Sequence, residues 1–430
     1  MSVTTPAGAS MRRPARVDAR GCPLTGASDE ALQRYEAALT AFRCWRTGAA
    51  TLAEAAAREA PAFVMAWLLQ AYLRVCSRDP QRVRSARPIL SHAVSLQANP
   101  FERQHAATIA ALLDDDYELA KARLGRLLRS QPRDVLALQV AHALDYLIGD
   151  IEGMAERVAA VLPAWSARWP GYGAVLAMHA FGLEERGDYA SAEHAARRAL
   201  ELDARNARAH HVMAHVFEMT GRPAAGLNWL RAHAGEWDGD TMVARHGNWH
   251  MALFHLARGD VAAGLELYDR RIAPGASGEI ADLIDASALL WRIALNGADV
   301  GARWRGLAAA WSPHVDDRFC SFNDIHAMLA FVGACDWSRA RRLLDSLAIS
   351  RAQPTRHGAS TRLLGAGACR ALLAFGQGNH ALAISLLASL PPTAHRLGGS
   401  QAQRDILRLT LDRAASRLRR SAAQASGMYM

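Results

Sequence analysis

The sequence predicts an all-α protein in which helix pairs stack into a right-handed α-solenoid. Ala, Leu and Arg dominate its 430 residues and β-branched residues are few, which favours helices over strands. A short turn with Gly-Asp, or with Asp before an aromatic residue, also recurs along the chain. It spaces Asp116 from Asp150, and Gly187 from Gly221, by 34 residues each. That period is the one of the tetratricopeptide helix-turn-helix unit.

The clearest repeat runs from Tyr172 to Asn206. Gly187 has no Cβ and suits the left-handed end of a first helix, and Asp188 can cap the second helix. Small alanines then let the two helices approach closely. Other turns are 37 to 43 residues apart, so an irregular helical bundle is the alternative. We expect roughly nine or ten helix pairs, because one pair alone cannot bury its apolar face.

The expected organisation has three parts. Residues 1–28 are expected to form a disordered basic arm, residues 29–420 a single tetratricopeptide-like solenoid, and residues 421–430 a flexible tail. The six cysteines are far apart and form no C-x-x-C pair, which is typical of reduced thiols in the cytoplasm. No apolar run reaches 18 residues and the N-terminus lacks the apolar stretch of a secretory signal, so no membrane partner is expected.

Charge and motifs exclude several function classes. The net charge is +9, but its arginines lie partly at the two ends and form no stripe interleaved with aromatic residues. No nucleic-acid-binding motif is present, so nucleic acid is not an expected partner. The sequence also lacks H-E-x-x-H, the phosphate-binding G-x-x-x-x-G-K-[ST] and the nucleophile motif G-x-S-x-G.

Polar residues at helical spacing mark the candidate site. In each repeat the first helix is expected to line the concave surface. His211, His215 and Glu218 form one stripe on such a helix, among apolar neighbours, and His246 and His250 repeat the i, i+4 spacing on the next first helix. A buried polar stripe needs partners, since each unpaired group costs about 1–3 kcal/mol. We therefore expect these side chains to meet on the concave wall.

Further polar or aromatic residues fall on neighbouring first helices and extend the candidate pocket. They are His142, Asp145, Tyr172, His179, Asn248, Trp249, Asp282 and Asp285. Two His at i, i+4 can chelate a transition metal, and carboxylates can complete its shell. The candidate metal ligands are His211, His215, His246, His250, Asp324 and His326.

The pattern allows three interpretations. The histidines can belong to an ordinary satisfied polar network, to a ligand pocket without metal, or to a metal or acid–base centre. The cofactor is therefore left open, with a divalent metal as one candidate. No catalytic residue is assigned, because the sequence offers no evident nucleophile.

The strings that carry these histidines also resemble a known family. The sequence is similar to the tetratricopeptide repeat protein 38 family over about residues 30–390, in the strings His211–Arg222, His246–His255, Asp282–Arg292, Asp324–Met328, Ala330–Ala334, Gly171–Gly173 and Phe181–Glu185. The resemblance implies a helical repeat protein and names no reaction. One string departs from the family's His-Asn-Trp-Trp-His, because Gly247 and Asn248 stand at its second and third positions. The Asn side chain therefore stands one position later than in the family, which is about 100° around the helix.

Two functions follow as hypotheses. The first is a binding module that holds a small molecule or a peptide in the His/Asp/Glu-lined concave groove. The alternative is an enzyme, metal-dependent or acid–base, that oxidises or hydrolyses a small molecule there. The oligomeric state is not predicted.

Overall fold

The protein is built from antiparallel helix pairs, as the recurring turns predict. The computed structural model describes residues 16–427 except 274–277 and 391. The N-terminal pairs are α1 (Asp29–Arg43) with α2 (Ala49–Glu59), α3 (Val64–Val75) with α4 (Pro80–Arg84) and α5 (Ala86–Ser95), α6 (Pro100–Leu113) with α7 (Tyr117–Ser130), α8 (Val135–Ile148) with α9 (Ile151–Val161), and α10 (Tyr172–Glu185) with α11 (Tyr189–Leu202).

The C-terminal pairs continue the same pattern. They are α12 (Ala207–Met219) with α13 (Pro223–Ala232) and the short α14 (Ala234–Trp237), α15 (Ala244–Ala257) with α16 (Val261–Leu267), α17 (Ile280–Leu295) with α18 (Arg303–Trp311), α19 (Ser321–Gly333) with α20 (Trp337–Arg351), and α22 (Ala366–Gly376), preceded by α21 (Arg356–Ser360), with α23 (His380–Ala388). The chain ends in α24 (Gln401–Arg404) and the long α25 (Ile406–Gly427).

The turns between paired helices have the predicted chemistry. Gly187 has a φ of +83°, and the Asp188 side chain accepts a hydrogen bond from the Ser191 N–H at 3.2 Å. Asp116 and Asp260 cap α7 and α16 in the same way. A cap of this kind stabilises its helix by about 1 kcal/mol, so the repeated aspartates define where each second helix begins.

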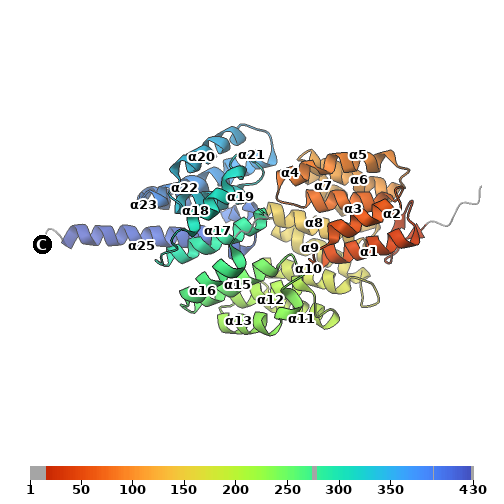
Figure 1. Cartoon of the computed structure of the whole chain (residues 1–430), viewed down its shortest axis with the longest axis horizontal. Coiled ribbons are helices and arrows are strands. Elements are labelled where there is room, and N and C mark those ends of the chain that lie inside the picture. The colour runs from red at the N-terminus through yellow and green to blue at the C-terminus, as the bar shows by residue number, and fades with distance from the viewer. Residues whose placement is uncertain (1–15, 274–277, 391, 428–430) are drawn as a thin grey trace, which may run out of the picture.

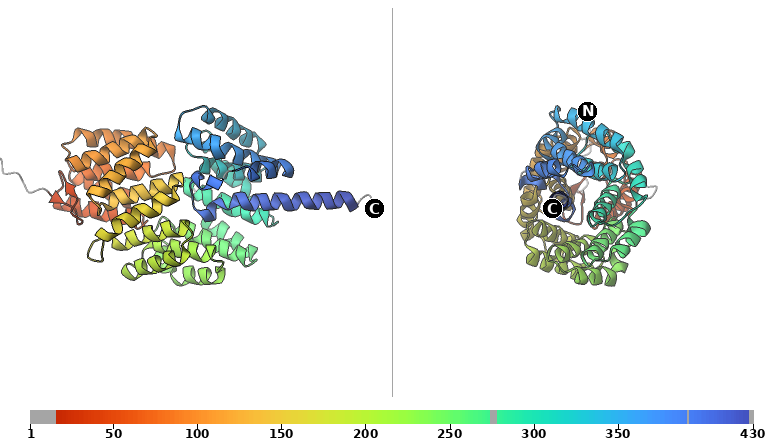
Figure 2. Two further views of the ribbon diagram at one scale, coloured as in Figure 1. Left: turned by 180° about the vertical axis from the view of Figure 1, so that it is seen from behind. Right: turned by 90° about the vertical axis from the view of Figure 1, so that its left-hand side faces the viewer.

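The pairs wind into a right-handed superhelix around a central axis. Figure 2 shows this ring of helices end-on, with α25 inside it, and Figure 1 shows α25 leaving the repeats as a single helix. Contacts of α25 with α17, α22 and α23 hold its first half in place. The interior of the superhelix is therefore partly filled by the chain's own C-terminal segment.

The N-terminal repeats meet the middle of the chain after one turn of the superhelix. Arg46 and Thr241 form an isolated antiparallel bridge, and the Met242 N–H donates to the Trp45 carbonyl at 2.7 Å. The loop after α1 thus lies against the loop before α15. This contact places Trp45 beside helix α12, whose residues form the site described below.

Both ends differ from the expected organisation. Residues 16–28 were expected within a disordered arm, but β1 (Arg16–Val17) pairs with β2 (Pro23–Leu24), and Arg20 is buried against Asp18 and Glu36 at 2.7 and 2.9 Å. Residues 1–15 lie outside the described residues. Helix α25 continues to Gly427, where a flexible tail was expected from residue 421, and residues 428–430 also lie outside.

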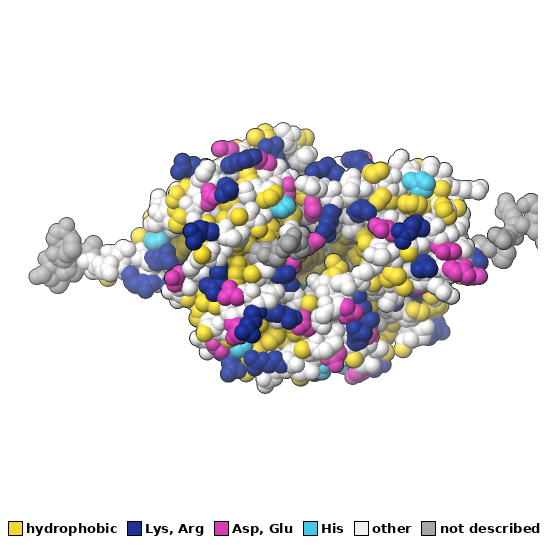
Figure 3. All heavy atoms as spheres, viewed as in Figure 1, with side chains coloured by type: hydrophobic (Ala, Val, Ile, Leu, Met, Phe, Trp, Pro, Cys, Tyr) yellow, Lys and Arg dark blue, Asp and Glu magenta, His cyan; other side chains and the backbone are white. Residues whose placement is uncertain are grey.

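The surface charges are mixed, and the cysteines are unpaired. On the face in Figure 3, the coloured Lys and Arg side chains lie among Asp, Glu and apolar side chains and gather into no continuous band. All six cysteines, which lie within the described ranges, have free thiols. No helix in the described part of the chain is both long enough and apolar enough to cross a bilayer.

Candidate functional site

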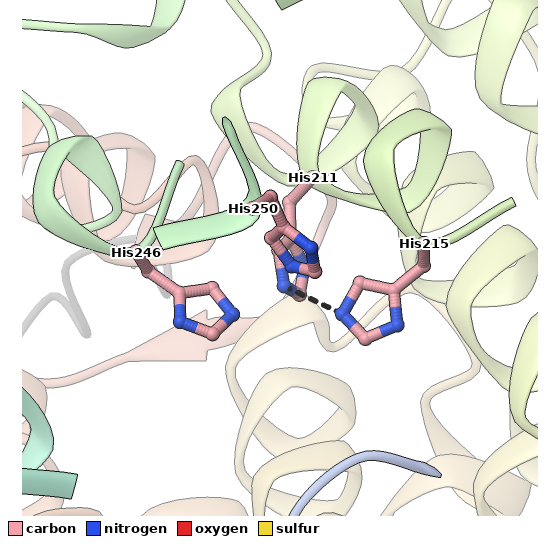
Figure 4. A group of neighbouring side chains, drawn as sticks. All are labelled: His211, His215, His246 and His250. Atoms are coloured by element: carbon pink, nitrogen blue, oxygen red, sulfur yellow. Dashed lines mark hydrogen bonds between the residues drawn. The ribbon is translucent and has the colours of Figure 1, made fainter. Parts of the chain in front are cut away.

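Four imidazoles from two neighbouring inner helices meet in the buried middle of the chain (Figure 4). His211 and His215 lie on α12, and His246 and His250 on α15. One ring nitrogen of each lies within 4.8 Å of the corresponding nitrogens of the others. The closest pair is His211 Nε2 and His215 Nε2, at 2.9 Å. The two predicted i, i+4 pairs therefore face each other across adjacent repeats.

Three of these imidazoles also lie next to a carboxylate through Nδ1. The pairs are His246 with Asp285 Oδ2 at 2.7 Å, His250 with Glu218 Oε2 at 3.0 Å, and His215 with Glu184 Oε2 at 3.4 Å. In each of these three rings Nδ1 faces the carboxyl group, so Nε2 is the ring nitrogen that can face the centre of the cluster. His250 Nε2 is buried without a hydrogen-bond partner among the described residues. His246 and His250 thus have the arrangement in which proteins hold metal-ligating histidines, with a carboxylate fixing the ring from behind. The His215 Nδ1 atom lies near Glu184 without a hydrogen bond to it.

Burial favours the neutral form of three of the four imidazoles. Desolvation lowers the pKa of His215 to about 4, and it lowers the pKa values of His211 and His250 well below the usual value. The same desolvation raises the pKa of Glu184 to about 8 and that of Glu218 to about 7. Neutral imidazoles are the form that binds metal, and a bound dication would favour ionised carboxyls beside it.

Aromatic rings enclose the cluster. Trp249 stacks on His246 with ring centroids 5.1 Å apart and planes at 11°. Phe181 from α10 packs against His211 and His215 at 5.6 and 5.5 Å. Trp45, brought in by the superhelical turn, lies 5.4 Å from His211. Such walls exclude water and strengthen electrostatic interactions inside the cluster.

A C-terminal strap, residues 398–405, lies against the site. Arg404 pairs with Glu185 at 3.0 Å, and Glu185 also accepts from the Gln401 N–H at 3.0 Å. The Gln403 side chain donates to Asp285 Oδ1 at 3.2 Å and accepts from the Tyr146 hydroxyl at 2.9 Å. The strap therefore contacts the carboxylate that orients His246.

A second possible donor set adjoins the first. Glu184 and Glu185 offer oxygens within 4.8 Å of each other and of a nitrogen of His215. Both glutamates are buried, and the pKa of Glu185 is raised by burial and by the neighbouring Glu184. Burial favours the protonated form of Glu184, whereas Glu185 has Arg404 as a cationic partner.

Other predicted pocket residues have local structural partners. His142 Nε2 lies 3.1 Å from the Met178 carbonyl, and its pKa is lowered by burial and by Arg208. Asp145 accepts from Arg157 at 2.9 and 3.2 Å. The structure thus separates these two from the four-histidine cluster, although they share a helix face.

Two more of the predicted residues lie on α10. Tyr172 begins this helix and packs, partly buried, against the N-terminal core. His179 is partly buried, and its pKa is lowered by that burial. Neither belongs to the group of four ligand atoms.

The remaining candidates also have structural partners outside the cluster. Asn248 donates to the Ala244 carbonyl at 2.7 Å on its own helix, and Asp282 pairs with Arg245 at 3.0 Å. Asp324 lies 2.7 Å from His357, and His326 Nδ1 lies 2.7 Å from the Phe322 carbonyl. Asp324 and His326 are therefore placed outside the group of four histidines.

Sequence reasoning missed the residues that come from distant segments. Glu184, Glu185, Trp45 and Arg404 were not among the candidates. A signal existed for the two glutamates, because they lie on a helix whose other residues are mostly apolar. Nothing in local spacing could bring Trp45 or Arg404 to this place.

The repeated helix pairs decide the fold. The chain is a tetratricopeptide-like repeat protein. No protein-family model matches the sequence. Solved structures similar to this chain include the Cut9–Hcn1 hetero-tetramer of APC/C, at 13% identity and a TM-score of 0.38 over 80% of this chain and 63% of that one.

Two others are more distant in shape. Naa15/Naa10 bound to HypK-THB has 12% identity and a TM-score of 0.28, over 91% of this chain and 63% of that one. The TPR domain of P58(IPK) has 12% identity and a TM-score of 0.23, over 91% and 98%. The tetratricopeptide-like chain thus spans about 63% of the length of the first two.

Proposed function

We propose that this repeat protein binds a divalent transition metal, with Zn²⁺ as the first choice, through His211, His215, His246 and His250. The observation that supports it most is the pair of Nδ1–carboxyl hydrogen bonds of His246 and His250, at 2.7 and 3.0 Å, behind ring nitrogens of all four histidines that lie within 4.8 Å of one another. Imidazole suits Zn, Cu, Fe and Ni. Nitrogens on one tetrahedral zinc lie roughly 3.3 Å apart, given a Zn–N distance of about 2.0–2.1 Å. Small side-chain shifts would convert the observed spacing into that geometry.

The experiment is metal analysis of the purified chain after dialysis against trace zinc. We expect close to one zinc per chain, and its loss in the double variant His215→Ala, His250→Ala. The matched control is His210→Gln, His255→Gln, which changes one histidine on each of the same helices. His210 bonds to the Ala204 carbonyl at 2.8 Å and His255 to Asp260 at 3.0 Å, away from the cluster. Zinc retained in the first variant would contradict the proposal.

The occupant of the site is proposed to be a small molecule rather than a peptide. The supporting observation is the C-terminal strap, which lies in the interior where a peptide would otherwise run. A cavity of about 570 Å³ remains beside the cluster, between α12, α15, α17 and α25. This volume is within the range of small-molecule pockets.

A second candidate function is metal-assisted hydrolysis in that cavity. Glu218 favours it, because this carboxyl lines the cavity and contacts His250 at 3.0 Å. A carboxylate in such a position is suited to take a proton from water. Zinc-loaded protein should then hydrolyse 4-nitrophenyl acetate, and Glu218→Gln should lose this activity even at a zinc concentration that keeps its weakened site loaded. Equal rates for both proteins would rule the second candidate out.

Membership of the tetratricopeptide repeat protein 38 family is likewise a proposal. It rests on the sequence strings around His211, His246, Asp282 and Asp324. A structure of a family member with four imidazoles on two adjacent repeats would support it. A member with those histidines on the outer surface would contradict it.

A further inference from the structure

The cavity beside the histidines continues the site along the same helices. Glu218 lies three residues after His215 on α12, and Leu253 and Phe254 lie three and four residues after His250 on α15. One helical turn is about 5.4 Å. The cavity is therefore the next layer of the solenoid interior, and Glu218 both lines it and contacts His250 at 3.0 Å.

The walls of this cavity are mainly apolar. The side chains that form them are Leu253, Phe254, Leu256, Leu295 and Leu409. Helix α25 provides the outer wall, where Asp412 and Arg413 carry opposite charges at the rim. These features fit a ligand whose body is a hydrocarbon chain or ring.

Arg292 is a buried basic residue in the lining of this cavity, near the carboxyl of Glu218. The residue is 7% exposed, and its guanidinium donates to the Ala288 carbonyl at 3.2 Å and to the Ala402 carbonyl. The ion pairs among the described residues include none to Arg292. A guanidinium has five N–H donors, and a buried one is best satisfied by a carboxylate. The guanidinium also lies over the Trp249 ring at 5.4 Å. Arg292 thus interacts with the carboxyls of Glu218, Asp285 and Asp405 only beyond ion-pair distance.

We propose that this cavity binds an apolar monocarboxylate, with the carboxylate on Arg292 and the hydrocarbon along Leu253, Phe254 and Leu409. In this pose the head group lies beside Glu218 and His250. The ligand's role as a substrate rests on the proposed metal centre, whereas its binding does not. The pocket would reject a cationic head group, because Arg292 would repel it.

Isothermal titration with three ten-carbon probes tests this assignment. The probes are decanoate, decan-1-ol and decyltrimethylammonium, added to the full chain with and without zinc. We expect decanoate to bind at least about ten-fold more tightly than the alcohol, because a hydrogen bond to a charged group contributes about 1.5–3 kcal/mol. The ammonium probe should not bind in the cavity. Equal affinity for the acid and the alcohol would overturn the proposal.

Variants connect the binding to this cavity. Arg292→Gln should weaken decanoate binding by about ten- to one-hundred-fold and leave the alcohol unaffected. Ala257→Trp, at the exposed mouth, should block both probes without disturbing the buried core. Arg408→Gln is the control, since this exposed arginine of α25 pairs with Asp405 and Asp412. Decanoate binding that survives Ala257→Trp would place the ligand elsewhere and overturn the proposal.

Zinc content measured on the same samples separates the two proposals. Zinc without Arg292-dependent decanoate binding would contradict the carboxylate pocket alone. Decanoate binding that depends on Arg292, in a protein that takes up no zinc, would contradict the metal centre alone.

Discussion

Two imidazoles of the cluster, His246 and His250, are oriented by a carboxyl group that contacts Nδ1. Asp285 is the clearest case, since one oxygen lies 2.7 Å from His246 Nδ1 and the other accepts from Gln403 at 3.2 Å. Asp285→Asn keeps the shape but weakens the polarisation of the ring. We expect zinc affinity to fall by about 10–100-fold, as measured by competition with a chromophoric chelator.

Asp282→Asn is the matched control for that change. It lies one helical turn earlier on α17 and pairs with Arg245 rather than with a histidine. Its effect on zinc affinity should be negligible. Similar losses in both variants would mean that charge in this region, rather than the contact with His246, determines affinity.

His142 gives a prediction about pH that is separate from metal binding. Burial and the adjacent Arg208 lower its pKa well below the usual 6.5, and its partner is the Met178 carbonyl. Unfolding lets the ring bind a proton below pH 6.5. Burying the ring in its neutral form therefore stabilises the fold fully above pH 6.5, and this stabilisation is lost as the pH falls.

Guanidinium unfolding at pH 7.5 and 5.0 measures this loss. Between pH 7.5 and 5.0, the free energy of unfolding should fall by about 2 kcal/mol less in His142→Gln than in the natural chain, since each pKa unit corresponds to 1.36 kcal/mol. His194→Gln, on the exposed face of α11, should decline like the natural chain. An unchanged decline in His142→Gln would show that this ring takes up its proton in the folded state.

At the scale of helices and turns, the sequence predicted most of the architecture. Gly187 and Asp188 combine a left-handed φ and a side-chain cap, and both are local properties of the chain. Likewise, i, i+4 spacing placed His211 with His215 and His246 with His250. The strap could not be predicted, because its contacts join Arg404 to Glu185, which is 219 residues away. Such pairings depend on the curvature of the whole solenoid.

The strap gives a prediction of its own. Arg404 and Glu185 form a nearly buried pair at 3.0 Å, so Arg404→Ala leaves the Glu185 carboxyl without its cation. Breaking a buried pair typically costs about 3–5 kcal/mol. We expect that loss in unfolding free energy, together with faster transfer of zinc to EDTA.

Arg408→Ala on the adjacent exposed surface is the comparison. Its ion pairs with Asp405 and Asp412 are exposed and should contribute less than about 1 kcal/mol. Zinc transfer at the natural rate in Arg404→Ala would mean that the strap stabilises the fold without covering the site.

For the whole molecule, the superhelical turn changes which residues can respond to one another. In an open solenoid each repeat contacts only its neighbours, so a ligand should affect adjacent repeats alone. Here the loop at Trp45 and Arg46 pairs with Thr241 and Met242, and Trp45 lies against His211. Periodicity predicts the repeats but not this closure, because the number of repeats per turn is set by small rotations at every interface.

Hydrogen exchange with and without zinc tests whether the closure transmits binding. Zinc should slow exchange in α12 and α15, and also in residues 44–47 and 398–404, which touch the site from both ends of the chain. Helices α20 and α23 should exchange equally in both states, because they lie outside these contacts. A ligand at 1,000 times its Kd stabilises by about 4.1 kcal/mol, which is enough for slowed exchange to be detected. Slowing confined to α12 and α15 would show that the repeats respond as a one-dimensional array and that the contact at Trp45 is passive.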